Sequence, residues 1–271
     1  MPFLTLTQGI IVLNFKEKPI VAVIYLRPLL GYPDHPGLDA VIEMAIEDLN
    51  ILKKCGVDAA LLENEHDRPY TLKASKEVIA SMAVVGHALK REAPEYCLGS
   101  EFLINDPEAS LAVAKASQHQ FIRTDYFVDR MSREEYGGEI EIDPKGLIAY
   151  RDKIQAQNIQ LLTDIQVKYA TLLEQKSLAQ SAKEAFEHQS SAAVVSGKIT
   201  GVAPEQSEII EAKSGAPELP ILIGSGLNRK NIPELFPHLD GAIVGSALMS
   251  NTRMDYEKVA PFMDLIRKYR N

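Results

Sequence analysis

Acidic and basic side chains stand at the ends of several short apolar runs in this chain. Asp164 and Lys168 end one run, Glu63 ends another, and Arg123 lies in a third. Carboxylates beside a buried cavity can transfer protons, and arginine or lysine can stabilise a negatively charged oxygen. These four residues therefore predict acid-base chemistry at one catalytic site.

More than one role is compatible with each of three charged residues, Asp164, Lys168 and Glu101. Asp164 is the strongest candidate for a general base or a metal ligand, because function most often justifies the desolvation of a carboxylate near a lumen. Lys168 could bind an anion, form a Schiff base, or simply lie exposed at its strand end. Glu101 could be a buried structural partner of Arg123.

Glycine-containing turns follow the last three apolar runs, at 196–201, 224–226 and 245–246. One such turn is more often only a tight connection, but two in series near the C-terminus favour an anion site. Glycine exposes backbone amides, and (β/α)8 barrels often hold phosphate after their last two strands. We also expect the helices that follow, one of them opening at Asn228, to direct their positive ends toward the anion. The predicted phosphate-binding residues are Ser196, Gly197, Thr200, Gly201, Gly224, Ser225, Gly226, Gly245 and Ser246.

The spacing of the apolar runs predicts the elements that position these groups. Runs of strand length start near residues 20, 59, 97, 121, 160, 192, 220 and 242, with helical patterns between them. Such alternation is typical of an all-parallel sheet, and eight units in 271 residues indicate a single-domain α/β protein, a (β/α)8 TIM barrel. A doubly wound open sheet is the structural alternative. We expect an N-terminal extension at residues 1–18 and the barrel at residues 19–271.

The parity of the strand residues predicts which side chains enter the barrel, because residues two apart share a face. Parity directs Asp164, Gln166 and Lys168 into the barrel near the carboxyl end of their strand, and it puts Asn105 on the face of Glu101. The charged segment 128–144 follows the fourth run. It is long enough to be a lid, and a solvated insertion is an equal alternative.

Composition and charge restrict the partners. Hydrophobic residues make up 46% and charged residues 24%, as in ordinary soluble proteins. The net charge of −8 disfavours nucleic acid and anionic membranes, which both need a positive surface. Two cysteines suggest no disulfide framework, the N-terminus is a poor signal peptide, and no apolar run is long enough for a membrane span. We expect a cytoplasmic protein without membrane insertion, and a homo-oligomer stays open.

The histidines and acids also bear on metal binding. His66 lies between two acidic residues, but no second histidine has the spacing of a zinc ligand. We therefore predict no cofactor. A divalent ion such as Mg²⁺ is the variant hypothesis, with Glu63, Asp164 and Asp125 as oxygen ligands.

Eight segments after residue 18 form an ordered set of motifs: VAVIYLRPLLGYP, GVDAALLENEHDRPY, FLINDPEASLAVA, FIRTD, LLTDIQVKYA, VVSGKITG, PILIGSGLNRKNI and DGAIVGSAL. This set resembles the BtpA/SgcQ family of predicted TIM barrels, which implies likeness to barrels of the ribulose-phosphate-binding type. The acidic-Asn pair of the family matches Glu63 and Asn64, and its Asn-Asp pair begins at Asn105, so both asparagines join the predicted substrate-binding residues. The chain departs from the family pattern at 65–67, where EHD replaces a Phe-Gly-Asp type, and at Tyr169, which replaces histidine.

The site residues and the resemblance together favour an enzyme for a small phosphorylated metabolite, either a sugar phosphate or a nucleoside phosphate. Isomerase or lyase chemistry would suit carboxylates that transfer protons. One branch of the family is associated with photosystem I accumulation. The alternative is therefore a non-catalytic biogenesis or stability factor for a membrane protein complex such as photosystem I.

Overall fold

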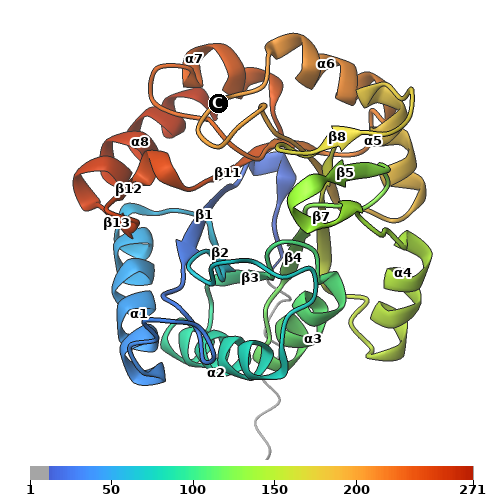
Figure 1. Ribbon diagram of the computed structural model, residues 1–271. Coiled ribbons are helices and arrows are strands. Elements are labelled where there is room, and N and C mark those ends of the chain that lie inside the picture. The colour runs from blue at the N-terminus through green and yellow to red at the C-terminus, as the bar shows by residue number, and fades with distance from the viewer. Residues whose placement is uncertain (1–11, 271) are drawn as a thin grey trace, which may run out of the picture.

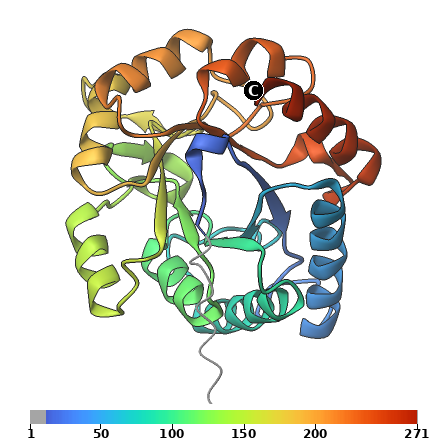
Figure 2. The ribbon, with the colours of Figure 1, turned by 180° about the vertical axis from the view of Figure 1, so that it is seen from behind.

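The computed structural model describes residues 12–270, and its centre is a closed barrel of eight parallel strands. The strands run in the order β1-β11-β10-β9-β7-β4-β3-β2 around the barrel. Helices surround the strands in both views of the molecule (Figure 1, Figure 2). The predicted (β/α)8 fold is confirmed, and the open-sheet alternative is wrong because β1 and β11 pair and close the ring.

The barrel strands coincide with the predicted apolar runs. They are β1 (Ile20–Tyr25), β2 (Ala59–Glu63), β3 (Cys97–Glu101), β4 (Phe121–Thr124), β7 (Gln160–Ile165), β9 (Ala192–Val195), β10 (Ile221–Ile223) and β11 (Gly241–Val244). Strands of a parallel barrel are covered on both faces, which is why these runs are almost continuously apolar.

The helices between the strands begin and end where local sequence favours it. Asp106 accepts a hydrogen bond from the amide of Ala109, and Pro107 takes the first helical position, as predicted. Gly56 adopts φ +71° and closes the first helix. The helices are α1 (Leu38–Cys55), α2 (Lys76–Glu92), α3 (Pro107–Ser117), α4 (Pro144–Lys153), α5 (Leu178–Glu187), α6 (Gln206–Gly215), α7 (Ile232–Leu235) and α8 (Tyr256–Tyr269). Among residues 12–270, no helix combines the length and the hydropathy needed to cross a membrane.

Alternate strand residues divide between the barrel interior and the helix layer. In β1, Val21 and Val23 belong to the interior cluster, and the residues between them pack against the helices. Phe121 fills much of the interior, and Gly99 makes room for it, since a Cβ there would lie 2.2 Å from its ring. Leu13 joins the same cluster, and its amide donates to Oε1 of Gln160 at 2.8 Å. The chain from residue 13 thus closes the amino end of the barrel, while residues 1–11 of the predicted extension lie outside the described residues.

The loops after β4 and β7 meet in a small antiparallel sheet at the mouth of the barrel. β6 (Gly138–Glu139), β5 (Met131–Arg133) and β8 (Thr171–Leu172) pair in that order. A small apolar cluster that includes Met131, Ile140 and Val167 packs together in these loops. Segment 128–144 is therefore a folded part of the mouth.

The short helical segment expected from Asn228 is present: α7 continues into the 3-10 turn η3 (Phe236–His238), and Ile232, Leu235 and Phe236 are buried. Two other predicted details at the mouth are wrong. β11 leads into a single 3-10 turn, η4 (Ser246–Leu248), so no long helix dipole follows directly after that turn. Gln166 adopts φ +46°, which ends the alternation of the strand. Its side-chain amide donates to the carbonyl of Lys176 and to Oγ of Ser181 in α5, outside the barrel.

Candidate active site

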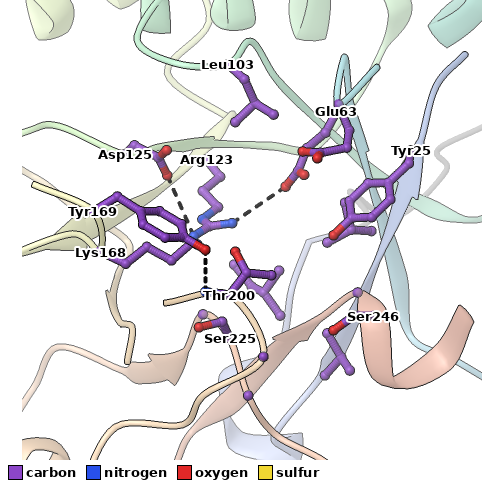
Figure 3. Close-up of a pocket in the computed structure, with 18 of the residues that line it drawn as sticks. Tyr25, Glu63, Leu103, Arg123, Asp125, Lys168, Tyr169, Thr200, Ser225 and Ser246 are labelled. Atoms are coloured by element: carbon purple, nitrogen blue, oxygen red, sulfur yellow. Dashed lines mark hydrogen bonds and ion pairs between the residues drawn. The ribbon is translucent and has the colours of Figure 1, made fainter. Parts of the chain in front are cut away.

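A cavity of about 600 Å³ opens at the carboxyl ends of the barrel strands. Its walls combine the ends of β1, β2 and β4, the loop sheet, and the turns after β9, β10 and β11. In Figure 3, Arg123 points into the space between Glu63 and Asp125, and Ser225 and Ser246 lie on the wall at the bottom of the view. The cavity therefore contains groups that could transfer protons and turns that could hold an anion.

Arg123 is the centre of a buried group of charges. Its Nε and Nη2 donate to the two carboxylate oxygens of Asp164 at 2.8 and 2.9 Å. Nη1 lies 3.5 Å from Oε1 of Glu63 and 3.7 Å from Oε2 of Glu101, and Nη2 lies 3.6 Å from Oδ1 of Asp125. The last three distances are too long for hydrogen bonds. The guanidinium therefore hydrogen-bonds both oxygens of Asp164, and its only interaction with the other three carboxylates is charge attraction.

Glu63 and Glu101 lie opposite each other on neighbouring strands, and both carboxyl groups are buried beside Nη1 of Arg123. Burial raises the pKa of Glu63 to about 7, against the opposing effect of Arg123. Burial raises the pKa of Glu101 well above its usual range, and the charges of Asp125 and Glu63 add to the effect. The pair therefore holds a proton near neutral pH, with Glu63 as the member that faces the cavity.

Asp164, which was predicted as the general base, lies beneath Arg123 and does not line the cavity. Its side chain is fully buried, and both of its oxygens accept hydrogen bonds from Arg123. Burial raises the pKa of Asp164, and Arg123 opposes this rise. Asp164 is therefore placed to orient Arg123. Glu63 lines the cavity, as a residue that transfers a proton to a ligand must.

Lys168 and Tyr169 reach the cavity from the loop after β7. The Lys168 amide donates to Oγ of Ser196 at 3.3 Å, which links this loop to the turn after β9. The hydroxyl of Tyr169 accepts a hydrogen bond from the Thr200 amide at 2.8 Å, shown as a dashed line in Figure 3. The two loops are thus tied together over the wall that carries Thr200 and Gly201.

The glycine turns form the opposite wall. Gly201, Ser225, Gly245 and Ser246 line the cavity together with Gly224 and Gly226. A Cβ at Gly224 would lie 2.1 Å from Cγ1 of Val194 and 3.3 Å from Nη2 of Arg123, and Gly226 adopts φ +83° against the backbone of Ala203. Glycine is therefore required for packing at both positions, and it also leaves this wall open to a ligand.

Four of the predicted binding residues do not line the cavity. Asn64 accepts from the Leu103 amide at 2.8 Å and so joins the loops after β2 and β3. Asn105 donates to the carbonyl of Glu141. Ser196 accepts from the Lys168 amide in the loop after β7, and Gly197 packs so tightly that a Cβ would lie 2.1 Å from the Val202 carbonyl oxygen. These residues support the loops of the mouth.

The model of one protein family, the BtpA family, matches residues 16–268. The chain belongs to the BtpA family. An uncharacterized protein of Archaeoglobus fulgidus is 33% identical over 244 residues, which cover 90% of this chain and 96% of that protein. The photosystem I biogenesis protein BtpA of Synechocystis is 29% identical over 257 residues, which cover 92% of this chain and 88% of that protein.

Solved structures share the barrel of this BtpA-family protein. Thiamine phosphate pyrophosphorylase from Pyrococcus furiosus superposes with a TM-score of 0.59 at 13% identity, over 94% of this chain and 96% of that one. Phosphoribosyl anthranilate isomerase from Thermus thermophilus gives a TM-score of 0.56 at 12% identity, over 92% and 98%. At such identities the likeness shows a common fold.

Several cavity residues of the BtpA-family protein escape prediction from the sequence. Tyr25 is the next inward residue after Val21 and Val23, so strand parity could have identified it. Arg68 belongs to a loop, and Arg133 ends the short strand β5 of the loop sheet, so the parity of the barrel strands applies to neither residue. Each ion-pairs with a glutamate of its own loop, Arg68 with Glu65 and Arg133 with Glu135.

The acids proposed as magnesium ligands, Glu63, Asp125 and Asp164, surround the Arg123 guanidinium. Within residues 12–270, no set of three or more histidine, cysteine, aspartate or glutamate side chains is arranged to hold a metal ion. The guanidinium occupies the position to which a divalent ion would be attracted, so these acids are already turned toward a cation of the protein itself.

Proposed function

We propose that this protein is an acid-base enzyme that acts on a small phosphorylated metabolite by isomerase or lyase chemistry. The observation that carries the proposal is one cavity that joins the glycine turns after β10 and β11 to Glu63 and Arg123. Glu63 would move a proton, and the opposite wall would hold the phosphate. The neighbours named for thiamine phosphate and phosphoribosyl anthranilate give general support, since barrels of this kind accommodate phosphorylated ligands.

The proposed chemistry begins with removal of a proton from a carbon next to a carbonyl group. A carboxyl group whose pKa is about 7 exists in both forms at neutral pH, so Glu63 can accept the proton and return it to the neighbouring atom. The carbonyl oxygen becomes negatively charged as the proton leaves. Arg123 and Lys168 both line the cavity and would stabilise that charge.

Exchange with solvent tests the proton transfer before the natural substrate is known. The protein is incubated in D₂O with a panel of phosphorylated aldoses and ketoses, and deuterium incorporation is followed by proton NMR. We expect exchange at a carbon next to the carbonyl of one or more compounds, and loss of exchange in Glu63→Gln. Glu187→Gln, which makes the same change at an exposed position of α5, is the matched control. Exchange that persists in Glu63→Gln would remove this residue from the mechanism.

The phosphate wall is tested at Ser246, because glycine cannot be replaced at Gly226 without strain. Ser246→Asp places a carboxylate on the wall and should abolish binding of inorganic phosphate by like-charge repulsion. Ser246→Ala removes a single hydroxyl and should weaken binding only a few-fold. Equal phosphate affinity in the two variants would show that the anion binds elsewhere.

A second candidate function follows from the name of the Synechocystis relative, a photosystem I biogenesis protein. In this alternative the protein acts through a partner-binding surface and without catalysis. Complementation of a deletion strain separates the two. Rescue by Glu63→Gln would support the biogenesis role, whereas failure of a folded Glu63→Gln protein would support the enzyme.

A further inference from the structure

Two carboxyl groups on the cavity wall are short of hydrogen-bond donors. Oε1 of Glu63 and Oδ1 of Asp125 are buried and have no hydrogen-bond partner, and the same holds for both carboxylate oxygens of Glu101 beneath them. Glu63 exposes 7% of its side chain and Asp125 exposes 12%, yet both residues line the cavity. Buried polar atoms are nearly always paired, so both carboxyl groups are short of donors at the part of the cavity wall that they form.

Arg123 restricts the kind of group that fits between these oxygens. Its guanidinium lies 3.5 Å from the Glu63 oxygen and 3.6 Å from the Asp125 oxygen. A ligand group placed beside all three residues must donate to the carboxylates and accept from the guanidinium. A hydroxyl does both, an ammonium group only donates, and a carboxylate or phosphate oxygen only accepts.

The charge of the cavity also disfavours a second anion. Among the described residues that line it are four acids and four bases: Glu63, Glu65, Asp125, Glu135, Arg68, Arg123, Arg133 and Lys168. Glu101 and Asp164 lie beneath them, so the acids remain in excess even when Glu63 and Glu101 share one proton. One phosphate already increases the negative charge, and a second anion would face Glu63 and Asp125 directly.

Two arginines at the rim of the cavity, Arg68 and Arg133, could in principle bind a second anion. Arg68 lies 4.0 Å above the ring of Tyr70 and Arg133 lies 4.9 Å above the ring of Tyr136, which fixes both guanidinium planes. Each guanidinium, however, is already paired with a glutamate of its own loop, Glu65 or Glu135. An anion would have to displace these carboxylates from the arginines. A hydroxyl group beside Glu63 and Asp125 would displace no hydrogen-bond partner from their unpaired oxygens.

We propose that Glu63, Asp125 and Arg123 form a subsite for adjacent hydroxyl groups, so that the substrate is a monophosphate with a hydroxylated, uncharged far end. This inference rests on the proposed function and narrows its substrate class to polyol and sugar monophosphates. It excludes bisphosphates and phosphorylated acids as preferred ligands. It also gives Asp125, which the sequence suggested only as a possible Mg²⁺ ligand, a role in binding hydroxyl groups.

A set of six-carbon ligands tests the subsite by calorimetry at pH 8. Sorbitol 6-phosphate should bind about tenfold or more tightly than inorganic phosphate, because its hydroxyls hydrogen-bond to charged groups. Fructose 1,6-bisphosphate and 6-phosphogluconate should bind more weakly than sorbitol 6-phosphate. Tighter binding of either one, with EDTA or with Mg²⁺ present, would overturn the inference, and a Mg²⁺ requirement would instead indicate a cation at the acids.

One variant separates recognition of the hydroxylated end of the ligand, the end away from its phosphate, from recognition of the phosphate itself. Asp125→Asn should lower the affinity for sorbitol 6-phosphate about tenfold and leave inorganic phosphate unchanged. Asp152→Asn on α4 is the matched control, and circular dichroism checks that both fold. Phosphate binding with no preference among the far ends would overturn this inference and leave the proposed function standing. Absence of binding by every phosphorylated compound would overturn both.

Discussion

The buried pair of Glu63 and Glu101 makes the stability of this protein depend on pH in a predictable direction. Glu63 has an ordinary pKa of 4.5 in the unfolded chain and a pKa of about 7 in the folded protein, because burial disfavours its charged form. Between these values the folded state holds a proton that the unfolded state has lost. The free energy of unfolding therefore falls as the pH rises through this interval, and it levels off above about pH 7.

The size of the effect follows from the change in pKa. Each pH unit corresponds to about 1.4 kcal/mol, so raising the pKa from 4.5 to about 7 gives about 3 kcal/mol. Glu63→Gln keeps the shape of the side chain and removes its titration. We therefore expect Glu63→Gln to gain about 3 kcal/mol in stability relative to the parent protein between pH 4.5 and pH 7.5. A variant that loses proton transfer should thus be the more stable protein at neutral pH.

Urea denaturation at half-unit steps from pH 4.5 to pH 8.5 measures this difference. Comparison with the variant cancels the pH dependence of the groups that do not interact with Glu63, and what remains belongs to the coupled pair of Glu63 and Glu101. The exposed Glu187→Gln variant should follow the parent at every pH. A constant difference between parent and Glu63→Gln, or a parent that gains stability as the pH rises, would refute the shared proton of the acid pair.

Three further predictions concern the groups around the cavity. Asp164→Asn should lower the free energy of unfolding by about 2 kcal/mol and reduce turnover, since Arg123 loses a charged partner; unchanged stability by urea denaturation would argue against the paired geometry. Lys176→Met should lower the free energy of unfolding by about 3 kcal/mol, because the buried Asp129 would keep its hydrogen bonds from Gln166 and Ser181 but lose its charged partner at 2.9 Å. A melting temperature equal to that of the parent would contradict this. Gly226→Ala should lower the free energy of unfolding by at least about 1 kcal/mol, because alanine is strained at φ +83° and its Cβ would clash with the backbone of Ala203. A crystal structure of the variant with an unmoved backbone would count against this.

The strands were predictable because their chemistry is local. Parallel strands covered on both faces require apolar, often β-branched runs, and such runs stand out at regular intervals in the chain. Parity within a run also placed Glu63 and Arg123 at one mouth, since alternation holds as long as the backbone stays extended. It failed at Gln166, where a positive φ that no residue type announces turns the chain away from the barrel.

The roles within the site depend on contacts that the sequence does not contain. Asp164 and Arg123 are 41 residues apart, and only the register of neighbouring strands shows that one holds the other. Asn64 and Asn105 were predicted to bind the ligand because they match asparagines of the family pattern. Their partners, Leu103 and Glu141, show that they join loops to one another.

The chemistry of the cavity arises from a shortage of donors. Asp164 takes both Nε and Nη2 of Arg123, which leaves Glu63, Glu101 and Asp125 with charge contacts at 3.5 to 3.7 Å. Strand pairing places Glu63 directly beside Glu101, so the pair lowers its energy by keeping a proton. A second arginine in place of Glu101 would satisfy every carboxylate, and it would also leave Glu63 permanently ionised and unable to act as an acid. Burial, opposed by only one buried guanidinium, therefore gives Glu63 two protonation states near neutral pH. An uncharged hydroxylated ligand would supply the missing hydrogen bonds and add no charge that fixes Glu63 in one state.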